Sequence, residues 1–145
     1  MKNLSNYKVI GKKVLFRADL NVPVLNGVIT DSSRILAIKS SIETLIKDKN
    51  KIFILAHFGR PQGEVIEKYS LQFILSSLAE ILEVDKIHFL KNLHEENISK
   101  KIDEMKSGEV CLIENIRFEK GEEKIDWDFA KNVSSFFDVY VNDAF

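Results

Sequence analysis

Short runs of apolar residues alternate along the chain with longer segments whose apolar residues recur at helical spacing. The runs predict strands over five stretches: 13–18, 52–56, 86–90, 109–113 and 137–141. The run Ile-Phe-Ile-Leu-Ala at 52–56 lacks polar alternation, which is typical of a strand covered by helices on both faces. Within 22–29, the pair Asn26-Gly27 lies between apolar residues and predicts a type I′ hairpin turn.

Helical spacing predicts a first helix over about 32–48, with Thr30 or Asp31 as its capping residue. A second helix is expected from about Leu71, after a loop over 58–69 that contains glycine and proline. Two more helices are predicted, over 95–105 and 126–135. Strands that alternate with crossover helices predict an α/β fold. The expected architecture is a Rossmann-like, three-layer single domain, with a parallel sheet of at least five strands flanked by helices.

Composition narrows the class of protein. The chain has 145 residues, of which 45% are hydrophobic and 30% charged, and its net charge is −1. Such a chain can bury a core, and the absence of a basic stripe argues against nucleic-acid or membrane partners. No apolar run approaches the roughly 20 residues of a membrane span, and the start lacks the apolar region of a secretory signal. The lone Cys111 is expected to be a buried hydrophobe, and the protein cytoplasmic.

Polar residues follow the predicted strands at their carboxyl ends, where parallel sheets bind ligands. The residues concerned are Asp19, Asn21, Arg34, His57, Arg60, Asn115, Arg117, Asn142 and Asp143. Three arginines and a histidine suit a small ligand with several negative charges, because a guanidinium can grip phosphate or carboxylate at two points. Asp19 does not favour an anion, so its expected partner is a ligand hydroxyl or a neighbouring arginine. Taken singly, each residue also has a structural explanation, such as a solvated arginine or a turn-forming asparagine. His88 and His94 lack a partner motif and are expected to be surface residues.

Five segments resemble, in the same order, the signature motifs of phosphoglycerate kinases. They are 17–23 (RADLNVP), 31–35 (DSSRI), 56–63 (AHFGRPQG), 114–118 (ENIRF) and 140–145 (YVNDAF). The resemblance extends over nearly the whole chain, and agreement of five ordered motifs is not expected by chance.

The resemblance implies a two-domain glycolytic kinase. Its amino-terminal domain would bind 3-phosphoglycerate or 1,3-bisphosphoglycerate, and its carboxy-terminal domain Mg-ATP or Mg-ADP. Residues 1–145 would be an incomplete amino-terminal domain, with the nucleotide-binding domain absent, so the chain alone is expected to be inactive. It is also expected to be a monomer. By motif, Arg34 is the catalytic arginine. The substrate-binding residues implied are Asp19, Asn21, Arg34, His57, Phe58, Gly59, Arg60 and Arg117. No cofactor or metal site of its own is expected.

Two other classes of function stay open. A non-catalytic α/β module that binds a phosphorylated metabolite would use the same arginines. A dinucleotide-binding oxidoreductase would need Gly-x-Gly-x-x-Gly after the first strand, where 19–23 reads Asp-Leu-Asn-Val-Pro. A phosphate-binding P-loop motif is also absent from the sequence.

Overall fold

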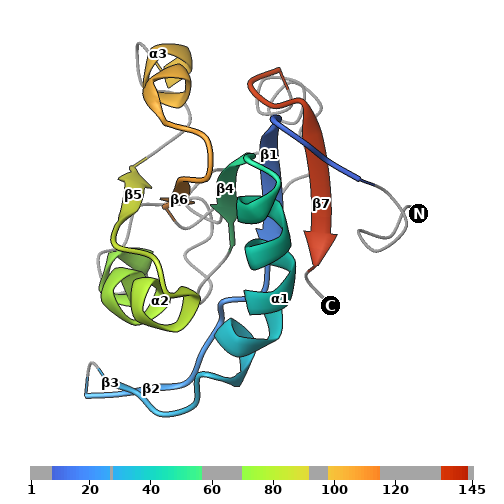
Figure 1. Cartoon of the computed structure of the whole chain (residues 1–145). Coiled ribbons are helices and arrows are strands. Elements are labelled where there is room, and N and C mark those ends of the chain that lie inside the picture. The colour runs from blue at the N-terminus through green and yellow to red at the C-terminus, as the bar shows by residue number, and fades with distance from the viewer. Residues whose placement is uncertain (1–7, 27, 57–69, 92–97, 115–134, 144–145) are drawn as a thin grey trace.

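The computed structural model of the chain describes residues 8–26, 28–56, 70–91, 98–114 and 135–143. At its centre lies a parallel sheet in the strand order β5-β6-β4-β1-β7 (Figure 1). The strands are β1 (Lys13–Ala18), β4 (Lys51–Leu55), β5 (Ile87–Leu90), β6 (Val110–Ile113) and β7 (Val139–Asp143). The predicted α/β fold with a parallel sheet of five strands is confirmed, and each strand lies within two residues of its predicted bounds.

Helices connect these strands. They are α1 (Ser33–Lys47), the 3-10 turn η2 (Leu71–Ile74), α2 (Leu75–Leu82) and α3 (Ile98–Glu104). The second predicted helix begins as a tighter 3-10 turn, and Ser70 caps that turn by accepting a hydrogen bond from the Gln72 amide. Most of the helix predicted over 126–135 lies outside the described residues, and Ser135 itself lies in a turn.

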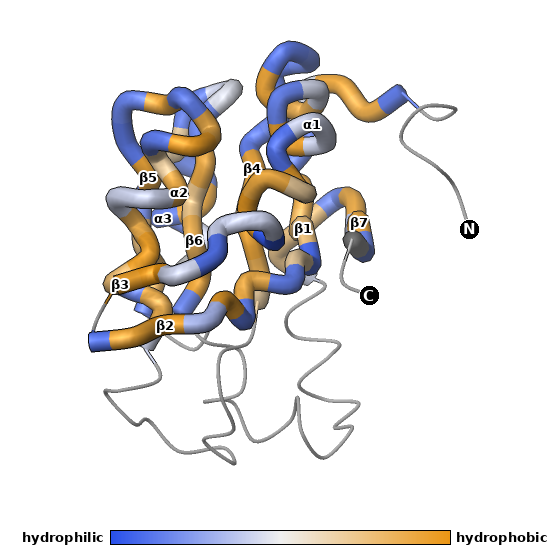
Figure 2. The backbone as a smooth tube through the Cα atoms, turned by 90° about the horizontal axis from the view of Figure 1, so that it is seen from below, coloured by the Kyte–Doolittle hydropathy of each residue, from blue (hydrophilic) through white to orange (hydrophobic). Residues whose placement is uncertain are grey.

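Alternate residues of each strand pack on opposite faces of the sheet, so the core has two parts. On one face, Val14 and Phe16 of β1 pack with the buried stripes of α1 and α2. On the other face, Leu15 packs with a cluster that includes residues of α3, and Phe136 and Phe137 lie against that cluster. Strands β1, β4 and β6 are mostly apolar along their length (Figure 2). Burial on both faces explains why the sequence run at 52–56 carries no polar alternation.

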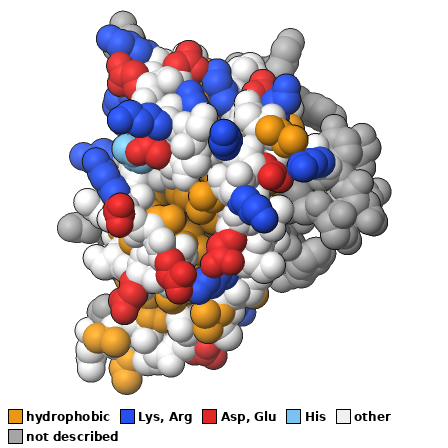
Figure 3. Space-filling view, in the orientation of Figure 1, with side chains coloured by type: hydrophobic (Ala, Val, Ile, Leu, Met, Phe, Trp, Pro, Cys, Tyr) orange, Lys and Arg blue, Asp and Glu red, His pale blue; other side chains and the backbone are white. Residues whose placement is uncertain are grey.

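The predicted hairpin is present but short. Strands β2 (Val24–Leu25) and β3 (Val28–Ile29) pair antiparallel, and Asn26 has a φ of 52°, in the left-handed region that a type I′ turn requires. Its apolar side chains are exposed, with Leu25 and Val28 each 65% accessible. Orange side chains show at the lower left of Figure 3, where Figure 1 places the hairpin, and acidic and basic side chains are interspersed over much of the described face above it. Among the residues that the structure describes, no helix combines the length and apolar character needed to cross a bilayer.

The start of α1 differs from expectation in one detail. Ser32, rather than Thr30 or Asp31, occupies the capping position, and its side chain makes no capping hydrogen bond. The Asp31 carboxylate instead accepts a hydrogen bond from the Ser33 amide at 2.8 Å. That hydrogen bond lowers the pKa of Asp31. An acidic side chain thus satisfies one of the free amides of the first turn, the turn that carries Arg34.

Asn50 fixes the edge of the sheet opposite the predicted site. Its side chain is fully buried, its Nδ2 donates to the carbonyl oxygens of Val9 and Leu45 at 2.9 and 3.0 Å, and its Oδ1 accepts from the Lys12 amide at 2.9 Å. Its backbone carbonyl also accepts from the Gly108 amide. The side chain of Asn50 therefore ties the end of α1 to the segment that enters β1, and its backbone carbonyl adds the segment that enters β6.

Replacing Asn50 by Ala is expected to lower the free energy of unfolding by about 3–5 kcal/mol, because three backbone groups lose their partners in a buried site. Urea unfolding monitored by circular dichroism measures the change. The control is Thr44→Ala on the exposed side of α1, where a hydroxyl bonds to the Ser40 carbonyl and a loss within about 0.5 kcal/mol is expected. Equal losses in the two variants would contradict the assignment of Asn50.

The prediction that Cys111 is a buried hydrophobe is confirmed: the residue has no accessible surface, and burial raises the pKa of its thiol to about 12. At pH 8 the folded chain therefore holds it as an unreactive thiol. Iodoacetamide is expected to label Cys111 only in step with unfolding by urea, as followed by mass spectrometry. Rapid labelling of the native chain would contradict this account.

Candidate functional site

Parallel pairing brings the carboxyl ends of the strands to one edge of the sheet. Arg17, near the end of β1, pairs with Leu55 of β4 on one side and with Asn142 of β7 on the other. Strand β6 lies next to β4, so the chain also leaves β6 at this edge. The carboxyl ends of four adjacent strands, β6, β4, β1 and β7, therefore meet at one edge of the sheet, as the sequence predicted.

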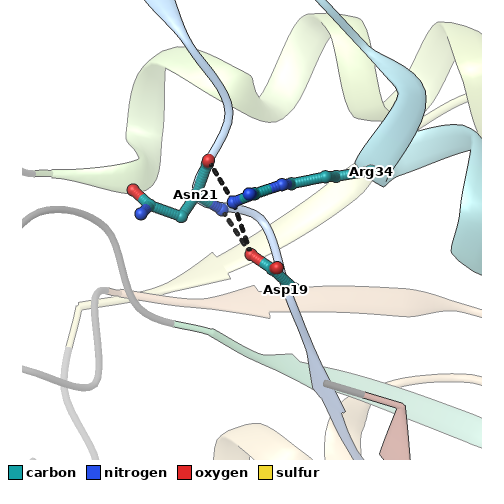
Figure 4. Close-up of polar contacts among 3 residues, drawn as sticks. All are labelled: Asp19, Asn21 and Arg34. Atoms are coloured by element: carbon teal, nitrogen blue, oxygen red, sulfur yellow. Dashed lines mark hydrogen bonds and ion pairs between the residues drawn. The ribbon is translucent and has the colours of Figure 1, made fainter. Parts of the chain in front are cut away.

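Three of the predicted site residues lie within bonding distance of one another at this edge (Figure 4). Arg34 Nη1 donates to Asp19 Oδ1 at 3.1 Å and to the carbonyl oxygen of Asn21 at 2.6 Å. The amide of Asn21 donates to the same Asp19 oxygen at 3.1 Å, which closes a tight turn after β1. One oxygen of Asp19 therefore shapes the turn and holds Arg34.

These bonds leave the Arg34 guanidinium accessible. Its side chain is 46% exposed, against 26% for Asp19, and its bonds to Asp19 and to the Asn21 carbonyl both use the same nitrogen, Nη1. The side-chain amide of Asn21 extends away from the guanidinium in Figure 4. The expectation that Asp19 pairs with a neighbouring arginine is thus confirmed. The Asp19 carboxylate offsets part of the positive charge of Arg34 and orients its guanidinium. A guanidinium can bind an anion through two parallel N–H donors.

Apart from Asn142 and Asp143, the other predicted site residues fall outside the described part of the chain: His57, Phe58, Gly59, Arg60, Asn115 and Arg117. Their connections to the sheet are described. Buried Ala56 follows β4, and Glu114 follows β6, so 57–69 and 115–134 both begin at the carboxyl edge. The loop predicted over 58–69 and the roles of these residues stay predictions.

The end of the last strand corrects one expectation. Strand β7 extends to Asp143, two residues beyond its predicted end, because Asn142 and Asp143 continue the register opposite Arg17 and Ala18. Asn142 is therefore a strand residue and not a turn former. Asn142 lies near the carboxyl edge of the sheet, because it pairs with Arg17 close to the end of β1.

Glu114 opens the motif at 114–118, and the sequence predicts no role for it. Its Oε2 accepts from Ser70 Oγ at 2.6 Å and its Oε1 accepts from the Leu71 amide at 2.8 Å. Its own amide donates to the carbonyl of Leu90 at 2.8 Å. The available signal was a carboxylate directly after a buried strand, but its partners lie more than 40 positions earlier in the chain.

His88 is partly exposed, as expected of a surface residue, but it has a partner that the sequence does not indicate. The residue is half-buried, and its Nε2 lies 3.0 Å from Glu109 Oε2. That hydrogen bond, together with one from the Lys106 amide, lowers the pKa of Glu109. Glu109 precedes β6, so this pair lies at the opposite edge from Arg34. His94 lies outside the described residues. No group of three or more potential metal ligands occurs among the side chains that the structure describes.

A family model described as phosphoglycerate kinase matches residues 4–145. The chain belongs to the phosphoglycerate kinase family. Curated relatives of the same name include those of Trichodesmium erythraeum, 46% identical over 145 residues, and Rhizobium meliloti, 44% identical over 137. These alignments cover 99% and 94% of this chain but 36% and 34% of the relatives. The chain thus spans about a third of the length of the family members it matches.

Solved structures agree with this membership. Phosphoglycerate kinase from Coxiella burnetii superposes with a TM-score of 0.85 at 33% identity, over 97% of this chain and 34% of that one. The enzyme from Pyrococcus horikoshii also superposes with a TM-score of 0.85, at 31% identity, over 99% of this chain and 36% of that one. The sequence resemblance is therefore confirmed at the level of family and fold.

The pairing of Arg34 with Asp19 generates a testable prediction. A double-mutant cycle on unfolding, with Arg34→Ala and Asp19→Ala, is expected to give a coupling free energy of about 0.5–1 kcal/mol at low salt, because both groups are partly exposed. The coupling should fall in 1 M NaCl. A control cycle on Lys39 and Glu83, 3.3 Å apart with Glu83 75% exposed, should give less. A coupling of zero for the first pair would contradict the geometry.

Proposed function

We propose that this chain is the 3-phosphoglycerate-binding part of a phosphoglycerate kinase. The whole protein would transfer a phosphoryl group between ATP and the carboxylate of 3-phosphoglycerate, in glycolysis and in the cytoplasm. Two observations support this: membership of the family, and Arg34 at the carboxyl edge of the sheet, oriented by Asp19 and by the Asn21 carbonyl. The orientation of Arg34 carries the proposal, because it presents a cation where the fold places ligands.

Binding of the substrate is assigned to the rest of the edge. His57, Arg60 and Arg117 would hold its phosphate or carboxylate, with Phe58 and Gly59 in the same segment. Asp19 and Asn21 would contact its hydroxyl and backbone. A ligand with several negative charges suits this set because each charge-assisted hydrogen bond contributes roughly 1.5–3 kcal/mol.

The proposed chemistry needs no general base. The acceptor is a carboxylate, which is ionised at neutral pH with an ordinary pKa of about 3.5. Catalysis then consists of positioning and charge neutralisation, and one well-placed arginine can contribute roughly 10³–10⁵ in rate. We assign that role to Arg34, whose guanidinium is half-exposed and can reach a bound anion.

The nucleotide is assigned elsewhere. Mg-ATP or Mg-ADP would bind to a carboxy-terminal domain outside residues 1–145, whereas these residues would belong to the amino-terminal, substrate-binding domain. By this assignment the chain binds 3-phosphoglycerate or 1,3-bisphosphoglycerate as a monomer, and it does not turn over alone. A coupled assay that detects ATP-dependent turnover by the 145-residue chain would contradict the division of roles.

Titration calorimetry of the chain tests the ligand. Binding of 3-phosphoglycerate should be tighter than binding of glycerate, which lacks the phosphate, and tighter than binding of 2-phosphoglycerate, in which it is displaced. A chain that binds all three alike would refute a site shaped for 3-phosphoglycerate. In the complete protein, retention of binding without any phosphoryl transfer would favour a non-catalytic module.

Substitution of Lys for Arg60 or Arg117 tests the two-point grip. Each change keeps the charge but removes the planar fork, so the Kd for 3-phosphoglycerate should rise about tenfold or more. Lys47→Arg, at the far end of α1, is the matched charge-preserving control and should leave the Kd unchanged. Unchanged affinity in both arginine variants would remove Arg60 and Arg117 from the site.

A further inference from the structure

Glu114 joins three elements at the carboxyl edge of the sheet. It directly follows β6, its amide bonds to the last residue of β5, and both its carboxylate oxygens bond to the start of η2. The residue is half-buried. Because both oxygens accept hydrogen bonds from fixed partners, the side chain is held in one orientation.

The partner of Glu114 at the start of η2 is itself a cap. Ser70 donates its hydroxyl to Glu114 at 2.6 Å, and the same oxygen accepts from the Gln72 amide at 3.2 Å. Leu71, which donates its amide to Glu114, has a fully buried side chain. A carboxylate in this position also satisfies amides at the start of a helical segment, where negative charge is favourable. The bonds therefore clamp the end of β6 onto the start of η2.

The clamp lies at the junctions of two segments that the proposed function depends on. Ser70 directly follows 57–69, which carries His57 and Arg60. Glu114 directly precedes Asn115 and the motif with Arg117. We propose that Glu114 is a positioning residue for anion binding: by fixing Ser70 against the end of β6, it sets the spacing between the two junctions. This inference rests on the proposed binding of 3-phosphoglycerate.

The charge of Glu114 favours this interpretation over direct contact with the ligand. A carboxylate repels an anionic ligand, so it belongs at such an edge only when its charge is bound by other donors. Here the Ser70 hydroxyl and the Leu71 amide supply those donors. Glutamine can keep the acceptor for one of the two bonds, whereas alanine removes both.

Glu109 provides a matched control at the opposite end of the same strand. Its Oε1 accepts from the Lys106 amide at 2.6 Å, and its Oε2 lies 3.0 Å from His88 Nε2. Glu109 is therefore also a glutamate next to β6, and both of its carboxylate oxygens also make hydrogen bonds. It differs from Glu114 in lying away from the proposed ligand.

The test is calorimetric titration of 3-phosphoglycerate into the 145-residue chain and its variants, with urea unfolding of each. Glu114→Ala is expected to raise the Kd about tenfold or more, and Glu114→Gln by a smaller factor. Glu109→Ala should leave the Kd within about twofold, although it loses a comparable set of hydrogen bonds. Ser70→Ala should also raise the Kd. Adding it to Glu114→Ala should cause little further loss, because both changes break the same clamp.

The outcomes separate the two proposals. Absence of binding by the unsubstituted chain would refute the proposed function, and this inference with it. Binding by the unsubstituted chain that survives Glu114→Ala and Ser70→Ala would overturn the inference alone. Equal weakening by Glu109→Ala and Glu114→Ala would also overturn it, because the effect would then follow general stability. If Glu114→Ala shows no cooperative unfolding transition, Glu114→Gln and Ser70→Ala decide the question.

Discussion

The parallel pairing of β1 with β4 on one side and β7 on the other brings the carboxyl ends of these three strands to one edge of the sheet. The register sets Arg17 beside Leu55 and Asn142, so the segments after these strands leave the sheet together. The core on both faces depends on the same pairing, since alternate residues of β1 belong to two different apolar clusters. A shift of one residue would exchange those faces and move Asp19 away from Arg34.

Two glutamates flank β6 and make different contacts at its two ends. Glu109 pairs with His88 where the strand begins, and Glu114 bonds to Ser70 and Leu71 where it ends. Asn50 fixes the first edge through buried backbone bonds. The second edge is held by side chains that leave Arg34 accessible. Buried backbone bonds therefore hold the edge opposite the site, and Asp19 holds Arg34 at the site's own edge.

Much of the fold could be predicted from the sequence because its signals are local. The bounds of β1 follow from a compact apolar run, and the hairpin turn at Asn26 from a residue that tolerates positive φ. Charge indicated that Asp19 would bond to a ligand hydroxyl or to a neighbouring arginine, and the structure shows the bond to Arg34. The resemblance of five motifs supplied the family, which composition and periodicity do not specify.

The remainder depends on contacts between distant residues. The 3-10 turn at the start of the second helix involves Ser70 and the Glu114 carboxylate, which lie 44 positions apart. The extension of β7 depends on its register with β1, and the partner of His88 lies 21 positions away. No local pattern encodes these pairings. These contacts between residues distant in sequence become visible only in the structure.

The central claim is that an anionic ligand binds at the carboxyl edge of the sheet. Chemical-shift mapping of the ¹⁵N-labelled chain during titration with 3-phosphoglycerate tests it most directly. The largest shifts are expected at Asp19, Asn21 and Arg34, with little change around Asn50 and Gly108. Shifts concentrated around Asn50 and Gly108, or no saturable shifts at all, would contradict the account.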